Sequence, residues 1–266
     1  DIPRRTLSEA RTKYPKTSFG DNMKLKSYML GLRAGDIHAK RIHKIIRLQT
    51  TTTHPAQIEM MKRTFNVYSH VGVHEFFNKG FDVQQWFVYC DVNESFSFLL
   101  EKPNEISSWI MNDEPDFYNF LAGYADCEGC WKMLRSHANG TRFVFQLSTQ
   151  DKQILFQIVK KLRALGYVAN IYLETKAGIG RNGVKSNKDM YRIMIYQRES
   201  LLRAASTLLP LSRHQEKIEK MQLILKSKDK SWAEIQYEVQ ELRDRIKKSR
   251  IQNRSTTPIV TIAAAQ

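Results

Sequence analysis

The spacing of hydrophobic and polar positions predicts the same order of helices and strands twice along the chain. Each half begins with an apolar helix of small residues, followed by two strands, a helix, two more strands and a final helix. This order predicts an α+β fold of two pseudo-symmetric αββαββα repeats, each with a four-stranded antiparallel sheet. The inner helices are expected at about 54–68 and 150–165. Strands are expected at 41–49, 71–77, 83–92, 130–136, 141–147, 168–175 and 190–197.

Turn and capping residues set some of these boundaries. Pro55 suits the first turn of the helix at 54–68, and Thr53 is expected to cap its N-terminus. The pair Asn139-Gly140 lies between two alternating runs and predicts a tight β-hairpin. Gly166 is expected to end the helix at 150–165.

Two short segments look like copies of one another. They are MLGLRAGDI at 29–37 and LAGYADCEG at 121–129, and each is expected to run as a helix that ends on a carboxylate, Asp36 or Glu128. A glycine beside an acid is also what an ordinary helix end looks like. Two matched copies without an internal gap favour a duplicated unit instead.

Small residues predict how the two helices meet. Gly31 and Gly35 lie four residues apart on one face, and Gly123 and Cys127 repeat the spacing. Packed in parallel at a central interface, the helices would bring both carboxylates to one spot. Carboxylates at helix C-termini are disfavoured by the helix dipole unless a cation is near. Paired acids must therefore share a proton or bind a divalent cation, for which oxygen ligands suit magnesium, calcium or manganese.

These motifs resemble those of LAGLIDADG homing endonucleases of the monomeric, two-repeat kind, in particular the archaeal intron-encoded members. The resemblance covers about 24–220. Segment 121–129 is close to the family signature, whereas 29–37 is looser and has Ile37 where the family usually has glycine. This departure leaves the geometry at the start of the first strand open.

The resemblance implies an activity and a cofactor. Such enzymes cut both strands of a long, asymmetric DNA site across its minor groove, leave 3′ overhangs and use metal-bound water as nucleophile. The acidic eighth residues of the two motifs, Asp36 and Glu128, match the family's metal ligands. Magnesium or manganese is the expected cofactor, and calcium is expected to bind without supporting cleavage.

The family also places polar or basic side chains around the metal ions. Besides the two acids, the candidate catalytic residues in this sequence are Gln49, Gln146, Lys132 and Lys217. Gln49 is equally compatible with an ordinary solvated position on a strand.

The outward sheet faces are expected to contact DNA. Alternation from 41 to 49 places Arg41, His43, Arg47 and Gln49 on one face, although Lys44 and Ile45 break the pattern. Two-stranded ribbons fit the major groove, but any water-exposed antiparallel sheet also has a polar face. A basic hairpin tip at 176–188 adds phosphate contacts. The candidate DNA-binding residues are His38, Lys40, Arg41, His43, Arg47, Gln49, Arg135, Arg142, Gln146, Arg181, Lys185 and Lys188.

The chain is strongly basic. It has 42 Lys and Arg against 27 Asp and Glu, a formal charge of +15 and a pI of about 9.7. This balance suits a polyanionic partner such as double-stranded DNA, with intron RNA as a further candidate. Ribosome-bound and membrane-surface proteins can be equally basic, so charge alone does not choose among them.

Three cysteines, Cys90, Cys127 and Cys130, do not form a secreted disulfide pattern. Cys127 and Cys130 make a CxxC, but no second pair completes a zinc or redox motif. The sequence has no apolar run of 18 residues and shows no signal-peptide pattern. We therefore expect an intracellular protein, cytoplasmic if archaeal, without a membrane partner.

The chain divides into four expected regions. These are a basic N-terminal arm at 1–23, the first repeat with its connection at 24–115, the second repeat at 116–225, and a C-terminal helical extension and tail at 226–266. The extension carries an apolar stripe expected to dock on the core, formed by Trp232, Ile235, Val239, Leu242 and Ile246.

The endonuclease has two alternatives on the same scaffold. One is a maturase that binds intron RNA, and the other is a DNA-binding regulator that has lost catalysis. The retained acids Asp36 and Glu128 favour cutting. An intein is disfavoured because the chain starts at Asp1, without Cys or Ser, and ends at Gln266 without a His-Asn pair. A monomer is expected because both repeats lie in one chain.

Overall fold

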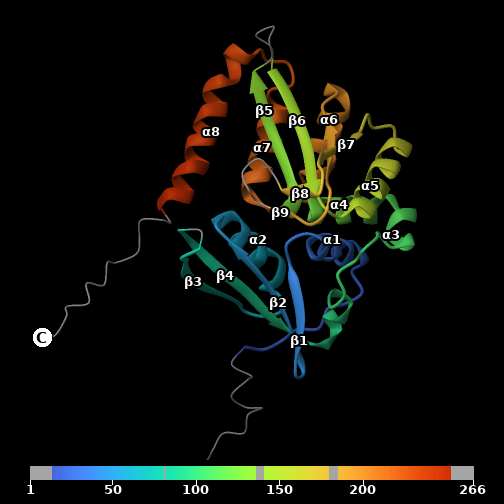
Figure 1. Cartoon of the computed structure of the whole chain (residues 1–266), viewed down its shortest axis with the longest axis vertical. Helices are drawn as coiled ribbons and strands as arrows, with labels where there is room; N and C mark the ends of the chain where they lie inside the picture. Colours follow the sequence, from blue (N-terminus) through green and yellow to red (C-terminus); the bar gives the residue numbers. More distant parts are fainter. Residues whose placement is uncertain (1–13, 81, 136–140, 180–184, 253–266) are drawn as a thin grey trace, which may run out of the picture.

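Two antiparallel sheets lie on either side of a central pair of helices in the computed structural model (Figure 1). The structure describes residues 14–80, 82–135, 141–179 and 185–252. Within this part of the chain, no helix has the length and hydrophobicity needed to cross a bilayer.

The first half builds a sheet with the strand order β1-β2-β4-β3. Short 3₁₀ and α-helical turns, η1 and α3, follow it in place of the single final helix that the repeat pattern predicts. In chain order the elements are α1 (Met23–Ala34), β1 (His38–Ile42), β2 (Ile45–Thr52), α2 (Pro55–Phe65), β3 (Val71–Asn78), β4 (Val83–Val92), η1 (Glu94–Leu99) and α3 (Ser108–Asn112).

The second half repeats this arrangement, with the strand order β5-β6-β10-β7. A two-stranded ribbon, β8 with β9, is inserted before the last strand, as the basic hairpin prediction requires. The elements are α4 (Glu114–Glu128), β5 (Gly129–Arg135), β6 (Thr141–Thr149), α5 (Lys152–Ala164), β7 (Asn170–Thr175), β8 (Gly178–Ile179), β9 (Lys185–Ser186), β10 (Met190–Ile195) and α6 (Arg198–Leu208). The equivalent strand orders confirm the predicted α+β fold with two four-stranded antiparallel sheets.

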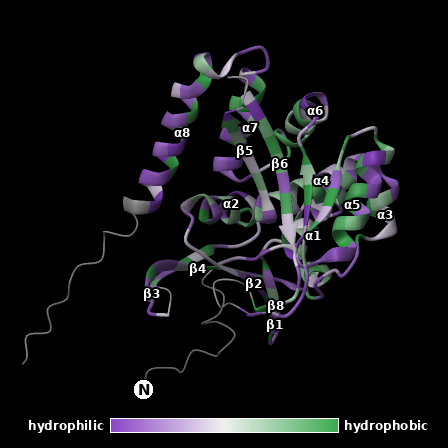
Figure 2. Cartoon of the chain, turned by 45° about the horizontal axis from the view of Figure 1, so that its top comes forward, coloured by the Kyte–Doolittle hydropathy of each residue, from purple (hydrophilic) through white to green (hydrophobic). Residues whose placement is uncertain are grey.

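Two further helices complete the chain, α7 (Gln215–Lys226) and α8 (Trp232–Gln252). The predicted stripe on α8 docks as expected, because Ile235, Val239 and Leu242 are buried in the common core. The ribbon of α8 is coloured mainly as hydrophilic (Figure 2). The helix therefore buries one narrow apolar face and exposes the rest.

The expected single strand at 41–49 is wrong, because a turn interrupts it. β1 ends at Ile42, His43 adopts a positive φ of 54°, and β2 begins at Ile45. A turn at His43 and Lys44 explains why the alternation breaks there in the sequence. The strands pair in antiparallel register across this turn, as a hairpin.

The turn also changes which residues share a face. Lys40 lies opposite Arg47, whereas Arg41 lies opposite the buried Ile46. Arg41 instead forms an ion pair with Glu94. The prediction that Arg41 and His43 share the face of Arg47 is therefore wrong, since a two-residue turn shifts the alternation.

Pro55 lies in the first turn of α2 as predicted, but Thr53 is not the N-cap of this helix. The capping position belongs to His54, whose side chain makes no capping hydrogen bond. The hydroxyl of Thr52 accepts a hydrogen bond from the His54 amide at 3.0 Å.

The strands β5 and β6 pair from Gly129 with Leu147 to Arg135 with Thr141. The predicted Asn139-Gly140 turn between them lies outside the described residues. Arg181, expected at the tip of the basic hairpin, and the N-terminal residues 1–13 also lie outside them.

Candidate active site

The two central helices pack as closely as their small residues predict. A Cβ atom on Gly31 would lie 2.1 Å from a backbone oxygen of α4, and one on Gly123 would lie 2.1 Å from a backbone oxygen of α1. A Cβ on Gly35 would lie 2.5 Å from the Cβ of Cys127. Contacts advance along both helices in the same direction, so the helices are parallel. Gly31, Gly35, Gly123 and Cys127 all lie at this contact.

Parallel packing places both predicted acids at the same end of the helix pair. Glu128 is the last residue of α4 and is partly buried, whereas Asp36 lies just after α1 and is exposed. Burial raises the pKa of Glu128 to about 7, and the negative charge of Asp36 adds to this increase. The two carboxylates are therefore close enough to interact, although they come from different halves.

Lys217 supplies the cation that the helix end requires. Its ammonium donates hydrogen bonds to the carbonyl oxygens of Ala125 at 2.7 Å and Cys127 at 3.0 Å, and also to that of Asp126. These are carbonyls at the C-terminus of α4, where a positive charge is favourable. Burial lowers the pKa of Lys217, and the charge of Asp126 opposes this effect. Lys217 thus holds the end of the helix that carries Glu128.

Asp126 joins three elements around this point and was missed at the sequence level. Its buried carboxylate accepts hydrogen bonds from the Tyr28 hydroxyl at 2.7 Å, the Arg213 amide at 2.7 Å and the His214 amide at 3.3 Å. The Ser212 hydroxyl donates a further bond. The carboxylate therefore ties α4 to α1 and to the start of α7. Its position inside the apolar motif gave no sign of this network.

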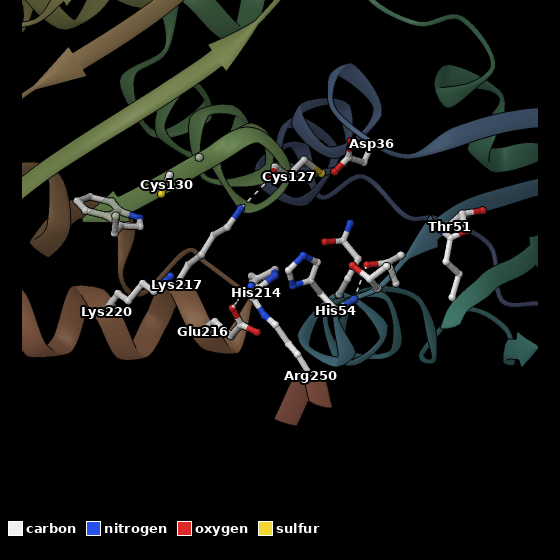
Figure 3. Close-up of a pocket in the computed structure, with 16 residues that line it drawn as sticks. Asp36, Thr51, His54, Cys127, Cys130, His214, Glu216, Lys217, Lys220 and Arg250 are labelled. Atoms are coloured by element: carbon white, nitrogen blue, oxygen red, sulfur yellow. Dashed lines mark hydrogen bonds and ion pairs between the residues drawn. The ribbon is translucent and has the colours of Figure 1, made fainter. Parts of the chain in front are cut away.

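A cavity of about 420 Å³ opens beside Asp36. Figure 3 shows His54 and His214 next to each other in it, at the first turns of α2 and α7. Burial lowers the pKa of His214 to about 2, with a further contribution from the charge of Lys217. Burial also lowers the pKa of His54. Both imidazoles are therefore neutral at physiological pH. The remaining charged side chains of the lining are Glu216, Lys217, Lys220 and Arg250.

The charged neighbours of Glu128 differ from the side chains that line the cavity beside Asp36. Lys102 forms an ion pair with Asp151 at 3.1 Å. The charge of Asp151 raises the pKa of Glu128, and that of Lys102 lowers it. Asp151 occupies the N-cap position of α5, as His54 does for α2. Neither Lys102 nor Asp151 was expected from the motifs, because only the folded connection brings them to Glu128.

The two glutamines take equivalent positions in the two sheets. Gln49 lies opposite His38, and Gln146 lies opposite Cys130. His38 lies two residues after Asp36, and Cys130 lies two residues after Glu128. The two glutamines therefore occupy equivalent strand positions in the two halves. Lys132 lies on β5 opposite Val144 and is not among the residues that line the cavity beside Asp36. Catalytic roles for these residues stay predictions.

The outward face of the first sheet carries Lys40 opposite Arg47. The Arg47 guanidinium forms two hydrogen bonds of 2.7 Å with the Asp91 carboxylate and lies 4.7 Å from the centre of the Tyr89 ring. Its charge is therefore partly neutralised before any ligand binds.

On the second sheet, Arg142 is exposed and lies opposite Leu134, on the face that also carries Gln146. Arg135 lies opposite Thr141, in register with the other face. Lys185 and Lys188 of the inserted ribbon region are exposed. DNA contact by these residues stays a prediction.

The donor set fits a weakly held divalent cation better than zinc. Within the described ranges, no group of three or more His, Cys, Asp or Glu side chains is arranged to hold a metal ion. Magnesium needs fewer protein ligands, since it keeps several waters and is often held by one or two carboxylates together with substrate phosphates. Asp36 and Glu128 provide such a pair. Cys127 and Cys130 are free thiols and complete no zinc site.

Part of this chain resembles one family of known proteins. Residues 118–208 match the family model described as LAGLIDADG-like domain. The search of curated proteins gave no match.

Solved structures give a likeness over most of the chain. The homing endonuclease I-WcaI, bound to its DNA recognition sequence, is 16% identical with a TM-score of 0.52, covering 82% of this chain and 94% of that chain. The meganuclease I-AabMI, bound to uncleaved DNA, is 12% identical with a TM-score of 0.46, covering 84% of this chain and 97% of that one. The segment 118–208 is therefore similar to the LAGLIDADG-like domain, and the chain shares its fold with the homing endonuclease I-WcaI.

Proposed function

We propose that this chain is a site-specific, double-strand DNA endonuclease of the LAGLIDADG homing type. It hydrolyses phosphodiesters of a long asymmetric site with a divalent metal and leaves 3′ overhangs. The observation that carries the proposal is the pair Asp36 and Glu128. They come from different halves and lie at the same end of two parallel helices in close contact, and the charge of Asp36 raises the pKa of Glu128.

Asp36 and Glu128 would hold magnesium or manganese, with calcium binding but not supporting cleavage. Such an ion, when bound, stabilises negative charge on phosphate oxygens and provides hydroxide near neutral pH. Lys217 keeps the end of α4 in place by binding its last carbonyls. Gln49 and Gln146 lie at matching strand positions, where their amides orient water by hydrogen bonding.

The outward faces of the two sheets would read the target. Two-stranded antiparallel ribbons fit the major groove, and each sheet contains such a pair, β1 with β2 and β5 with β6. The formal charge of +15 favours a polyanionic ligand. Because one chain supplies both sheets and both acids, we assign the active species as a monomer of the two-repeat kind, like the archaeal intron-encoded enzymes.

Selection from a randomised duplex library tests this function and finds the target sequence in the same experiment. The protein is incubated with the library and Mg²⁺, and the new DNA ends are captured and sequenced. We expect paired cuts that recur in one long motif and leave short 3′ overhangs. The Asp36→Asn, Glu128→Gln double variant serves as the control and should give no such ends.

Ends that recur equally with the double variant would contradict the proposal. Binding of duplex DNA without any cleavage would instead indicate a regulator, and selective binding of structured RNA would indicate a maturase.

A further inference from the structure

The cavity beside Asp36 receives a side chain from outside the two repeats. Arg250 lies near the C-terminal end of α8, yet it lines the same cavity as Asp36 and His54 (Figure 3). Its guanidinium donates one hydrogen bond of 2.6 Å to the Glu216 carboxylate in the first turn of α7. Glu216 is buried, so this ion pair is shielded from water on one side.

Two buried polar atoms of this cavity have no hydrogen-bond partner among the described residues. They are Nε of Arg250 and Nδ1 of His214, and the His214 side chain is only 5% exposed. A buried polar atom without a partner is unfavourable, and a bound ligand or an ordered water commonly satisfies it.

The backbone around these atoms also favours an anion. Helices α2 and α7 both begin at the cavity. Neither N-cap side chain, His54 or His214, accepts a capping hydrogen bond from a backbone amide of its helix. Helix N-termini carry partial positive charge and unpaired N–H groups. Lys220 adds a full positive charge to the lining.

We propose that Arg250 binds a backbone phosphate of the DNA substrate in this cavity, so that helix α8 contributes directly to the substrate site. The inference rests on the proposed endonuclease function. In the free protein Glu216 binds one nitrogen of the guanidinium, and the unpaired Nε is among the donors left for a phosphate oxygen. An arginine presents its donors in a fixed fork that matches phosphate, which a lysine does not reproduce.

Binding of duplex DNA by a set of variants tests this role. The probe is a fluorescent duplex recovered from the library selection, with affinity measured in Ca²⁺ as salt is raised. Arg250→Ala should weaken binding about tenfold and reduce the slope of log affinity against log salt by about one. Arg250→Lys should restore the slope but not the full affinity.

The matched control is Lys247→Ala, which removes the same charge from an exposed position on the same helix. It should change affinity much less. Glu216→Gln separates phosphate binding from mere docking of α8. If Arg250 binds phosphate, this variant binds DNA as tightly as the wild type or more tightly. If the ion pair only anchors α8, it weakens binding as Arg250→Ala does.

Equal affinities for Arg250→Ala and Lys247→Ala, or a loss in Glu216→Gln that matches Arg250→Ala, would overturn the inference. The proposed function would then stand, provided that the wild type binds and cuts the duplex. A wild type that neither binds nor cuts duplex DNA would reject both.

Discussion

Each half of the molecule contributes one acid to the carboxylate pair, but the helix ends differently before Asp36 than at Glu128. In the second half, α4 continues to Glu128, and Gly129 follows at a point where a Cβ atom would lie 2.5 Å from a carbonyl oxygen. In the first half, α1 stops at Ala34, and Ile37 buries its side chain in the core. The glycine missing from the first motif is thus accommodated by an earlier helix end. An equivalent acid position does not require an equivalent turn.

The surroundings of the two acids differ as well. Asp126, two residues before Glu128, anchors the start of α7, whereas the matching residue of the first motif is Ala34. Glu128 is partly buried and has a raised pKa, whereas Asp36 is exposed and lines the cavity. The second half is the more rigidly braced side, and the first half is the more accessible one.

The largest loss of stability is expected at the contact between α1 and α4. Gly123→Ala places a Cβ against the backbone of α1, so the helices must separate, at a cost of more than about 3 kcal/mol. The melting temperature should fall by about 10 °C. Gly20→Ala is the control, since a Cβ there meets nothing within 4 Å. Equal stability of the two variants would show that the helices do not pack this closely.

The second-largest loss of stability is expected from removing the hydrogen bonds of Asp126, which the first half does not have. Asp126→Ala leaves the Tyr28 hydroxyl and two backbone amides without their buried acceptor, and should destabilise the protein by about 3 kcal/mol in urea unfolding. The exposed Asp21→Ala removes the same charge and should have little effect. A loss no larger than that of the control would mean that the network around Asp126 contributes nothing.

The pH dependence of stability should report the environment of Glu128. The pKa of Glu128 rises from 4.5 to about 7 on folding, so the folded state favours the protonated carboxyl. Without divalent metal, stability relative to Glu128→Gln should therefore be greatest below about pH 4.5, fall as the pH rises, and level off above about 7. Urea unfolding at several pH values measures this difference. A difference that does not change with pH would contradict the enclosed environment of Glu128.

The smallest effect is expected on the sheet faces. Arg142→Ala should weaken duplex binding about tenfold, because this exposed guanidinium is available for phosphate or base contacts. Arg47→Ala should also weaken binding, but less, because Asp91 already neutralises part of the Arg47 charge. Fluorescence anisotropy at increasing salt measures both. Affinity that is independent of salt in the wild type would exclude the sheets as the DNA surface.

The sequence predicted most of the fold because its signals are local. Gly31 and Gly123 indicated a close helix contact, and the alternating runs located the strands of both sheets. The turn at His43 was missed because neither Asn nor Gly marks it, although the alternation breaks there. The environment of Glu128 could not be predicted, because Lys102 and Asp151 reach it only through the folded chain.

The role of the C-terminal helix was also beyond local reasoning. The apolar stripe predicted that α8 docks, and Ile235, Val239 and Leu242 confirm it. Nothing in the stripe indicates that Arg250 reaches the cavity beside Asp36, since that depends on where the helix ends in space.

Strand-resolved cleavage by the two single acid variants tests the central claim most directly, namely that Asp36 and Glu128 form one metal site. A duplex from the library selection is labelled differently on each strand and incubated with Mg²⁺. Asp36→Asn and Glu128→Gln should each slow cutting of both strands by at least about a thousandfold. Affinity for the duplex, measured in Ca²⁺, should survive in both. Cutting by both variants at the wild-type rate would contradict the shared site.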